Sequence, residues 1–118
     1  MFNVNGYDIT LSKGDTGAIL ITTTTTYTFD ENDRAVFTLK DGSGAIVKEV
    51  IAGLTNGAFT VEFYNQDTDT LASGNYSWDV RYVIHPYYDD AGRIINGDQV
   101  ITPRQPMSLT LLNVVGEV

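Results

Sequence analysis

The sequence predicts an all-β domain, folded as a Greek-key sandwich of about seven to nine short strands. One observation is the supply of strand-forming residues: seven Tyr, five Phe, one Trp and an unbroken run of Thr at positions 22–26. Aromatic and β-branched side chains favour extended backbone. A second is that Gly or Asn-Gly recurs about every ten residues, between runs in which apolar and polar residues alternate. No segment shows the periodicity of a long helix.

The first half of the chain contains four of the expected strands. Residues 7–13 alternate, with Tyr7, Ile9 and Leu11 on one face. Residues 17–26 follow and include the Thr run, whose stiff side chains suit a strand. Residues 34–40 and 45–51 form a hairpin across the loop Asp41-Gly42-Ser43-Gly44, which is rich in residues that accept a positive φ.

The second half supplies four more strands. Asn56-Gly57 predicts a tight turn that leads into residues 58–64. The strongest pattern spans residues 76–84, and Pro86 is expected to end that strand. Residues 93–102 return with an interruption at Asn96-Gly97-Asp98, and residues 107–112 close the sheet.

Strand parity also predicts the centre of the core and one corner of the fold. The core is expected to contain Phe37, Leu39, Trp78 and Val80. The spacing of Leu71, Gly74 and Tyr76 is that of a tyrosine corner, a feature of immunoglobulin-like sandwiches in which the Tyr hydroxyl returns to upstream backbone. We expect its acceptor within residues 69–71.

Composition limits the function. A chain of 118 residues is the size of one domain, so residues 1–118 are taken as a single sandwich. It has no Cys, which excludes a disulfide scaffold, a thiol catalyst and a zinc finger. Its formal net charge of −8 would repel nucleic acid and anionic membranes, so neither is expected as a partner. The start of the chain lacks the pattern of a secretory signal.

Candidate catalytic and metal-binding residues are few, and no cofactor is expected. His85 is the only imidazole; a solvated residue at a strand end is the simpler interpretation, and a general base the alternative. Asp67 and Asp69 resemble the start of a calcium loop, but Thr70 and Tyr76 stand where such a loop needs Gly and Glu. No Ser has the setting of a nucleophile elbow. The sequence therefore predicts no catalytic residue and no metal ligand.

A cluster of aromatic residues is the remaining functional signal. Tyr82, His85, Tyr87 and Tyr88 lie close together in the sequence and are expected on the surface. Exposed Tyr side chains are common in protein-protein contacts, and stacked aromatic rings near Asp or Asn also bind sugars. Both interpretations remain open from the sequence.

Four short motifs suggest a family. They are Leu-Ser-Lys-Gly-Asp-Thr at 11–16, Asp-Thr-Leu-Ala-Ser-Gly-Asn-Tyr at 69–76, Trp-Asp-Val-Arg at 78–81 and Gly-Asp at 97–98. With these motifs the chain resembles small tail and baseplate proteins of bacteriophages and prophages of Gram-positive bacteria. Among these proteins, it resembles the immunoglobulin-like N-terminal domain of phage baseplate upper proteins.

The resemblance implies a non-enzymatic virion protein that contacts other tail or baseplate proteins and forms a homo-oligomer in the particle. It also implies a location in the phage tail, or in the bacterial cytoplasm when the protein is expressed from a prophage. A carbohydrate-binding module for a cell-surface glycan is the first alternative function, and a head-decoration or adaptor protein is the second.

Overall fold

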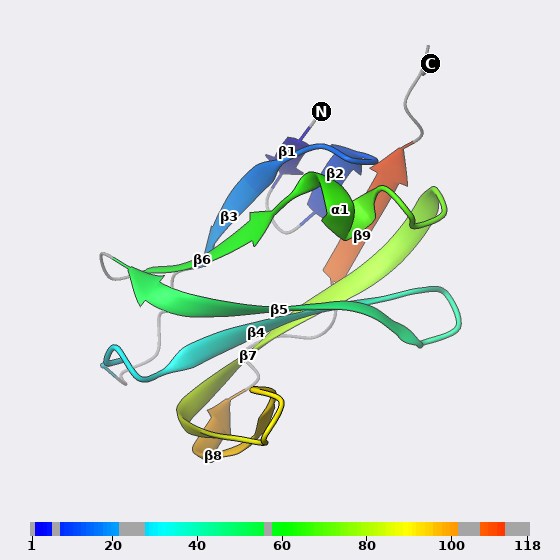
Figure 1. Ribbon diagram of the computed structural model, residues 1–118. Coiled ribbons are helices and arrows are strands. Elements are labelled where there is room, and N and C mark those ends of the chain that lie inside the picture. Colours follow the sequence, from blue (N-terminus) through cyan, green and yellow to red (C-terminus); the bar gives the residue numbers. More distant parts are fainter. Residues whose placement is uncertain (1, 6–7, 22–27, 56–57, 102–106, 113–118) are drawn as a thin grey trace.

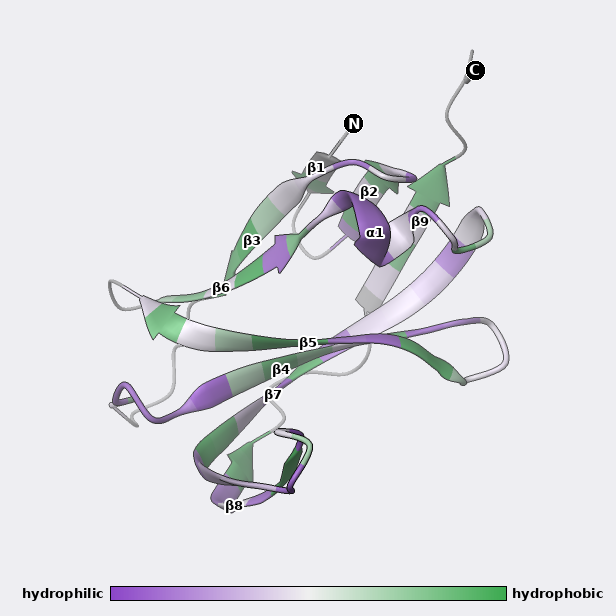
Figure 2. Ribbon diagram, in the orientation of Figure 1, coloured by the Kyte–Doolittle hydropathy of each residue, from purple (hydrophilic) through white to green (hydrophobic). Residues whose placement is uncertain are grey.

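The computed structural model describes residues 2–5, 8–21, 28–55, 58–101 and 107–112, and this part of the chain is all-β (Figure 1). Its one helix is α1 (Asn65–Thr68), a single turn of polar residues (Figure 2), of which Thr68 is buried. The strands are β1 (Phe2–Asn5), β2 (Asp8–Ser12), β3 (Gly17–Ile21), β4 (Arg34–Lys40), β5 (Ile46–Thr55), β6 (Ala58–Phe63), β7 (Gly74–Tyr88), β8 (Ile94–Ile101) and β9 (Met107–Leu112). The predicted all-β class is confirmed.

The described strands form one continuous sheet in the order β1-β2-β9-β7-β4-β5-β6-β3, and β8 pairs with β7 beside this path. All pairs are antiparallel except β2 and β9, which run parallel. The sandwich predicted from the sequence would have two separate sheets. Instead, β5 pairs with β4 from Ile46 to Gly53 and with β6 only at Leu54 and Thr55. Strand β5 therefore joins the β6–β3 part of the sheet to the rest of it. The result is a curled, sandwich-like sheet.

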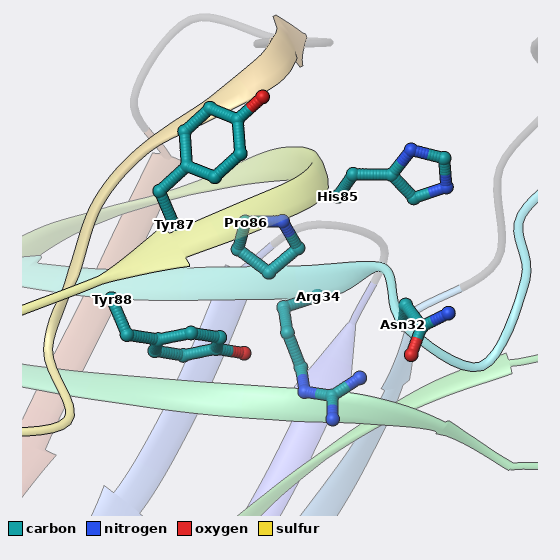
Figure 3. Close-up of a pocket in the computed structure, with 6 residues that line it drawn as sticks. All are labelled: Asn32, Arg34, His85, Pro86, Tyr87 and Tyr88. Atoms are coloured by element: carbon teal, nitrogen blue, oxygen red, sulfur yellow. The ribbon is translucent and has the colours of Figure 1, made fainter.

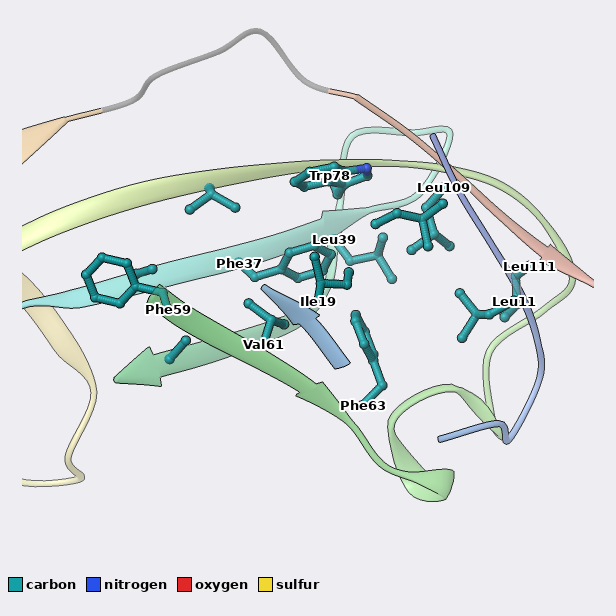
Figure 4. Close-up of a cluster of buried hydrophobic side chains, with 14 of the residues drawn as sticks. Leu11, Ile19, Phe37, Leu39, Phe59, Val61, Phe63, Trp78, Leu109 and Leu111 are labelled. Carbon is teal, nitrogen blue, oxygen red and sulfur yellow. The ribbon is translucent and has the colours of Figure 1, made fainter. Parts of the chain in front are cut away.

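The apolar core lies between the paired strands β3 and β6 and the main part of the sheet (Figure 4). Phe37, Leu39, Trp78 and Val80 are all buried there, as strand parity predicts. The ring of Trp78 stacks on that of Phe37, with centroids 5.3 Å apart, and its Nε1–H donates to the Ser108 carbonyl at 3.1 Å. Phe63 of β6 meets Phe37 edge-on from the other side at 5.4 Å. These contacts fix β6 over the centre of the sheet.

Strand β7 is longer than the sequence predicts, because Pro86 does not end it. Pro86 pairs with Gly97 inside a ribbon that continues to Tyr88. Strand β4 pairs with β7 only as far as Val83, so Pro86 lies where β7 has a single neighbouring strand among the described residues, a position in which proline is tolerated.

Strand β8 also runs without the predicted interruption at Asn96-Gly97-Asp98. A Cβ atom at Gly97 would lie 2.5 Å from Val83 Cγ1 and 2.8 Å from the Ile84 carbonyl oxygen. Glycine here permits close approach of two backbones rather than a break in the strand.

The Tyr76 hydroxyl returns to upstream backbone, but its acceptor is the Ala72 carbonyl at 2.5 Å and not residues 69–71. Residues 68–71, at the end of α1, form a turn in which the Leu71 N–H donates to the Thr68 carbonyl at 3.1 Å. The first carbonyl beyond that turn accepts the bond. The predicted acceptor was therefore wrong by one position.

Three sequence predictions fall outside the described residues: the place of Tyr7, the extended run of Thr at 22–26, and the Asn56-Gly57 turn.

Candidate functional site

A shallow, open pocket lies where the turn before β4 meets the far end of β7 (Figure 3). Its volume is about 480 Å³, and it is lined by Asn32, Arg34, His85, Pro86, Tyr87 and Tyr88. Three of the four residues predicted as a contact surface are therefore close together here. Tyr87 and Tyr88 are 52% and 46% exposed.

The fourth predicted contact residue, Tyr82, is not at the surface. It is buried, and its ring packs against Phe59 at 5.5 Å and Phe29 at 5.0 Å. Tyr82 shares the inward parity of Trp78 and Val80, which places it in the core. The prediction of a surface role for Tyr82 was wrong.

The backbone of His85 has a φ of +48°, and among the described residues no other non-glycine residue has a positive φ. Histidine is among the few residue types enriched in this conformation. The His85 N–H donates to Asp33 Oδ1 at 3.0 Å. Asp33 is completely buried, and its second oxygen accepts the Asp30 N–H at 2.9 Å. One buried carboxylate thus fixes both the 30–33 turn and the unusual backbone at His85.

The turn itself follows from its sequence. The Asp33 N–H donates to the Asp30 carbonyl at 3.1 Å, and Asp30 Oδ1 accepts the Asn32 N–H at 2.8 Å. Short Asp side chains favour such local bonds over a strand. Arg34 then donates through Nη1 to the carbonyls of Glu31 and Asp33, at 2.7 and 2.8 Å. The turn is therefore held from both sides.

The His85 ring lies between two carboxylates from different elements. Nε2 is 3.0 Å from Asp30 Oδ2 in the turn, and Nδ1 is 3.1 Å from Asp98 Oδ2 in β8. The Tyr87 hydroxyl donates to the other oxygen of Asp98. The ring and its three side-chain partners form one network, which we call the His85 network: Asp30, His85, Tyr87 and Asp98.

The network shifts the pKa of each of its members. Hydrogen bonds to Asp30 and Asp98 raise the pKa of His85 above its ordinary value. The bond from His85 lowers the pKa of Asp30, and the bonds from Tyr87 and His85 lower that of Asp98. The bond to Asp98 raises the pKa of Tyr87. These directions favour an imidazolium flanked by two carboxylates.

The same groups offer ligand atoms with the spacing of a cation site, since atoms of Asp30, Asp33 and His85 lie within 4.8 Å of one another. Each of these atoms already has a hydrogen-bond partner, however: Asn32, Asp30 and His85 use the carboxylate oxygens, and Asp30 and Asp98 use the two ring nitrogens. A metal would have to displace a proton from the imidazole. We therefore describe the group as a hydrogen-bonded network and assign no metal to it.

The network also limits what His85 can do chemically. A general base needs an unprotonated nitrogen within reach of its substrate. Both nitrogens of His85 point at carboxylate oxygens, so the protonated ring has no lone pair to offer. The geometry suits the fixation of two chain segments.

Sequence reasoning placed His85 and Tyr87 in the site but missed Asp30, Asp33 and Asp98. The signals were present as the Asp-x-x-Asp spacing at 30–33 and the Gly-Asp pair at 97–98. Their connection to His85 depends on which strands pair.

No known protein family matches the chain, and no curated protein sequence matches it either. Among the described residues, no helix has the length and apolar character that crossing a membrane would need.

Proposed function

We propose that this protein is a non-enzymatic structural subunit of a phage or prophage tail or baseplate, which acts through contacts with copies of itself and with neighbouring tail proteins. The observation that carries the proposal is the β7–β8 arm, residues 84–101. Figure 1 shows it at the end of the molecule away from the two chain ends.

The arm presents apolar side chains to solvent. Ile95 is 66% exposed, and Val100, Tyr87 and Tyr88 are also exposed. Tyr is enriched in protein interfaces, and groups of exposed apolar residues mark interaction sites. A surface of this kind is what a subunit needs to contact its neighbours.

The arm also has an open strand edge. Among the described strands, β8 pairs only with β7. An edge strand presents unpaired N–H and C=O groups that a strand of another chain can complete. Apolar side chains and a free edge on one projecting hairpin support assembly by strand contact.

Sedimentation velocity over a range of protein and salt concentrations tests this proposal. The charge of −8 per chain opposes association, and salt screens it over roughly 10 Å at 0.1 M. We therefore expect association to strengthen with salt. Ile95→Glu should abolish it, whereas Ile46→Glu, which changes the charge equally at another exposed position, should not. A monomer under all conditions, with no binding to co-expressed tail proteins, would contradict the proposal.

Glycan binding is the second candidate function, and the pocket beside Tyr87 and Tyr88 favours it. Exposed aromatic faces next to the Asn32 amide and the Arg34 guanidinium are suitable for a sugar ring. Titration with cell-wall polysaccharide would then shift the Tyr NMR signals in a saturable way, and the double variant Tyr87→Ala/Tyr88→Ala would lose the effect. A structural subunit should show no such shift.

A further inference from the structure

The hydrogen bonds at His85 require a particular protonation state. Carboxylate oxygens only accept, and a neutral imidazole has a single N–H to donate. The two ring nitrogens face Asp30 Oδ2 at 3.0 Å and Asp98 Oδ2 at 3.1 Å. Only the doubly protonated ring can satisfy both contacts. After loss of one proton, a nitrogen lone pair must face one of the carboxylates.

The charges around the His85 ring also favour its doubly protonated form. Asp30 and the buried Asp33 face it from the turn, and Asp98 faces it from β8. On β7 itself the Tyr87 hydroxyl bonds Asp98, and Arg34 of β4 lines the same pocket but donates to the carbonyls of the turn. Without the imidazolium charge, Asp98 on the arm and Asp30 on the turn repel each other across a neutral ring.

The arm depends on such connections because it projects beyond the main sheet. From Ile84 to Tyr88, β7 pairs only with β8 among the described strands. A ribbon of two strands has little stability of its own in water. The bonds from His85 to Asp33 and Asp30 join this ribbon to the turn before β4.

We propose that His85 is a pH-sensitive latch, which holds the β7–β8 arm to the 30–33 turn while its ring carries two protons and loosens the arm when one is lost. The latch goes beyond the proposed contact function, since it sets the mobility of the segment that carries Tyr87, Tyr88 and Ile95.

The direction of the pH effect follows from linkage. The pKa of His85 is raised in the folded protein, so its contribution to stability is complete below the pKa of the unfolded state, about 6.5, and is lost as pH rises through the folded pKa. The pKa values of Asp30 and Asp98 are lowered, so their contribution is present above the unfolded value, about 3.9, and is lost as pH falls through the folded values. The latch is closed between these limits.

NMR titration of the full chain tests the latch directly, because His85 is the only histidine and its ring signals need no assignment. We expect its pKa to lie above the ordinary value. Asp30→Asn and Asp98→Asn should each lower it, whereas Asp8→Asn, the same change at an exposed position on β2, should leave it unchanged. A His85 pKa at or below the ordinary value would overturn the proposal.

A second measurement separates a latch from a local ion pair. Backbone amides of β8 and of the 30–33 turn should shift with the midpoint of the His85 ring, and their protection from hydrogen exchange should fall above it. His85→Asn should abolish this pH dependence, because Asn accepts a positive φ but does not titrate in this range. Amides that do not follow the ring, or that still titrate in His85→Asn, would refute the latch.

Discussion

The buried hydroxyl of Thr38 should make Thr38→Val a stabilising substitution. Thr38 lies in the middle of β4, between Glu49 of β5 and Asp79 of β7, and only 4% of it is exposed. Among the described residues, its Oγ1 has no hydrogen-bond partner. Valine replaces this hydroxyl with a methyl group and keeps the β-branched shape that a strand favours.

The magnitude follows from the burial. A buried hydroxyl without a partner costs about 1–3 kcal/mol in proteins, and the methyl group that replaces it gains from leaving water. We allow for a small difference in packing and expect Thr38→Val to raise the free energy of unfolding by about 1–2 kcal/mol. For a domain of this length, that corresponds to a rise in Tm of roughly 4–8 °C.

Urea unfolding followed by circular dichroism measures this difference. The matched control is Thr60→Val on β6, where the residue is only half-buried, so the change should stay within about 0.5 kcal/mol. A loss of stability in Thr38→Val would contradict this prediction, because it would show that the Thr38 hydroxyl makes a hydrogen bond that valine cannot make.

Three further substitutions test the packing. Trp78→Ala should cost about 3–5 kcal/mol in denaturant melts, since it removes a buried ring stacked on Phe37; a loss below about 1 kcal/mol would refute its place in the core. Gly97→Ala should destabilise the arm, because the new Cβ would lie 2.5 Å from Val83 Cγ1; unchanged hydrogen exchange in β8 would contradict this. Tyr76→Phe removes the hydrogen bond to the Ala72 carbonyl and should cost about 1 kcal/mol by the same melts. An unchanged stability would contradict this prediction, because it would show that solvent replaces the bond fully.

The sequence predicts well those strands whose ends are marked by neighbouring residues in the sequence. The bounds of β4 and β9 agree with the prediction because alternating residues end at turn-forming or proline-containing segments. The end of β7 was missed because Pro86 was taken as a terminator, and its tolerance depends on how far β4 extends beside it. The single continuous sheet depends on the two pairs between β5 and β6, which strand patterns do not contain.

The site was predictable only in part, for a similar reason. Tyr87 and Tyr88 follow from a local aromatic cluster, and both are exposed. The contact between Asp30 and His85 spans 55 residues, and it forms only because β4 and β7 pair. Tyr82 shows the converse: its place in a surface cluster followed from nearness in sequence, whereas strand parity put it in the core.

Site-specific photo-crosslinking tests the central claim, that the β7–β8 arm is a contact surface, most directly. A photoreactive phenylalanine analogue would replace Ile95 on the arm and, in a control protein, Ile46 on β5, which is also exposed. At high protein and salt concentration, we expect irradiation to produce covalent dimers from position 95, with the cross-link mapped to the arm of the second copy, and none from position 46. Equal cross-linking at both positions, or none at position 95 with either a second copy or a tail protein, would contradict the account.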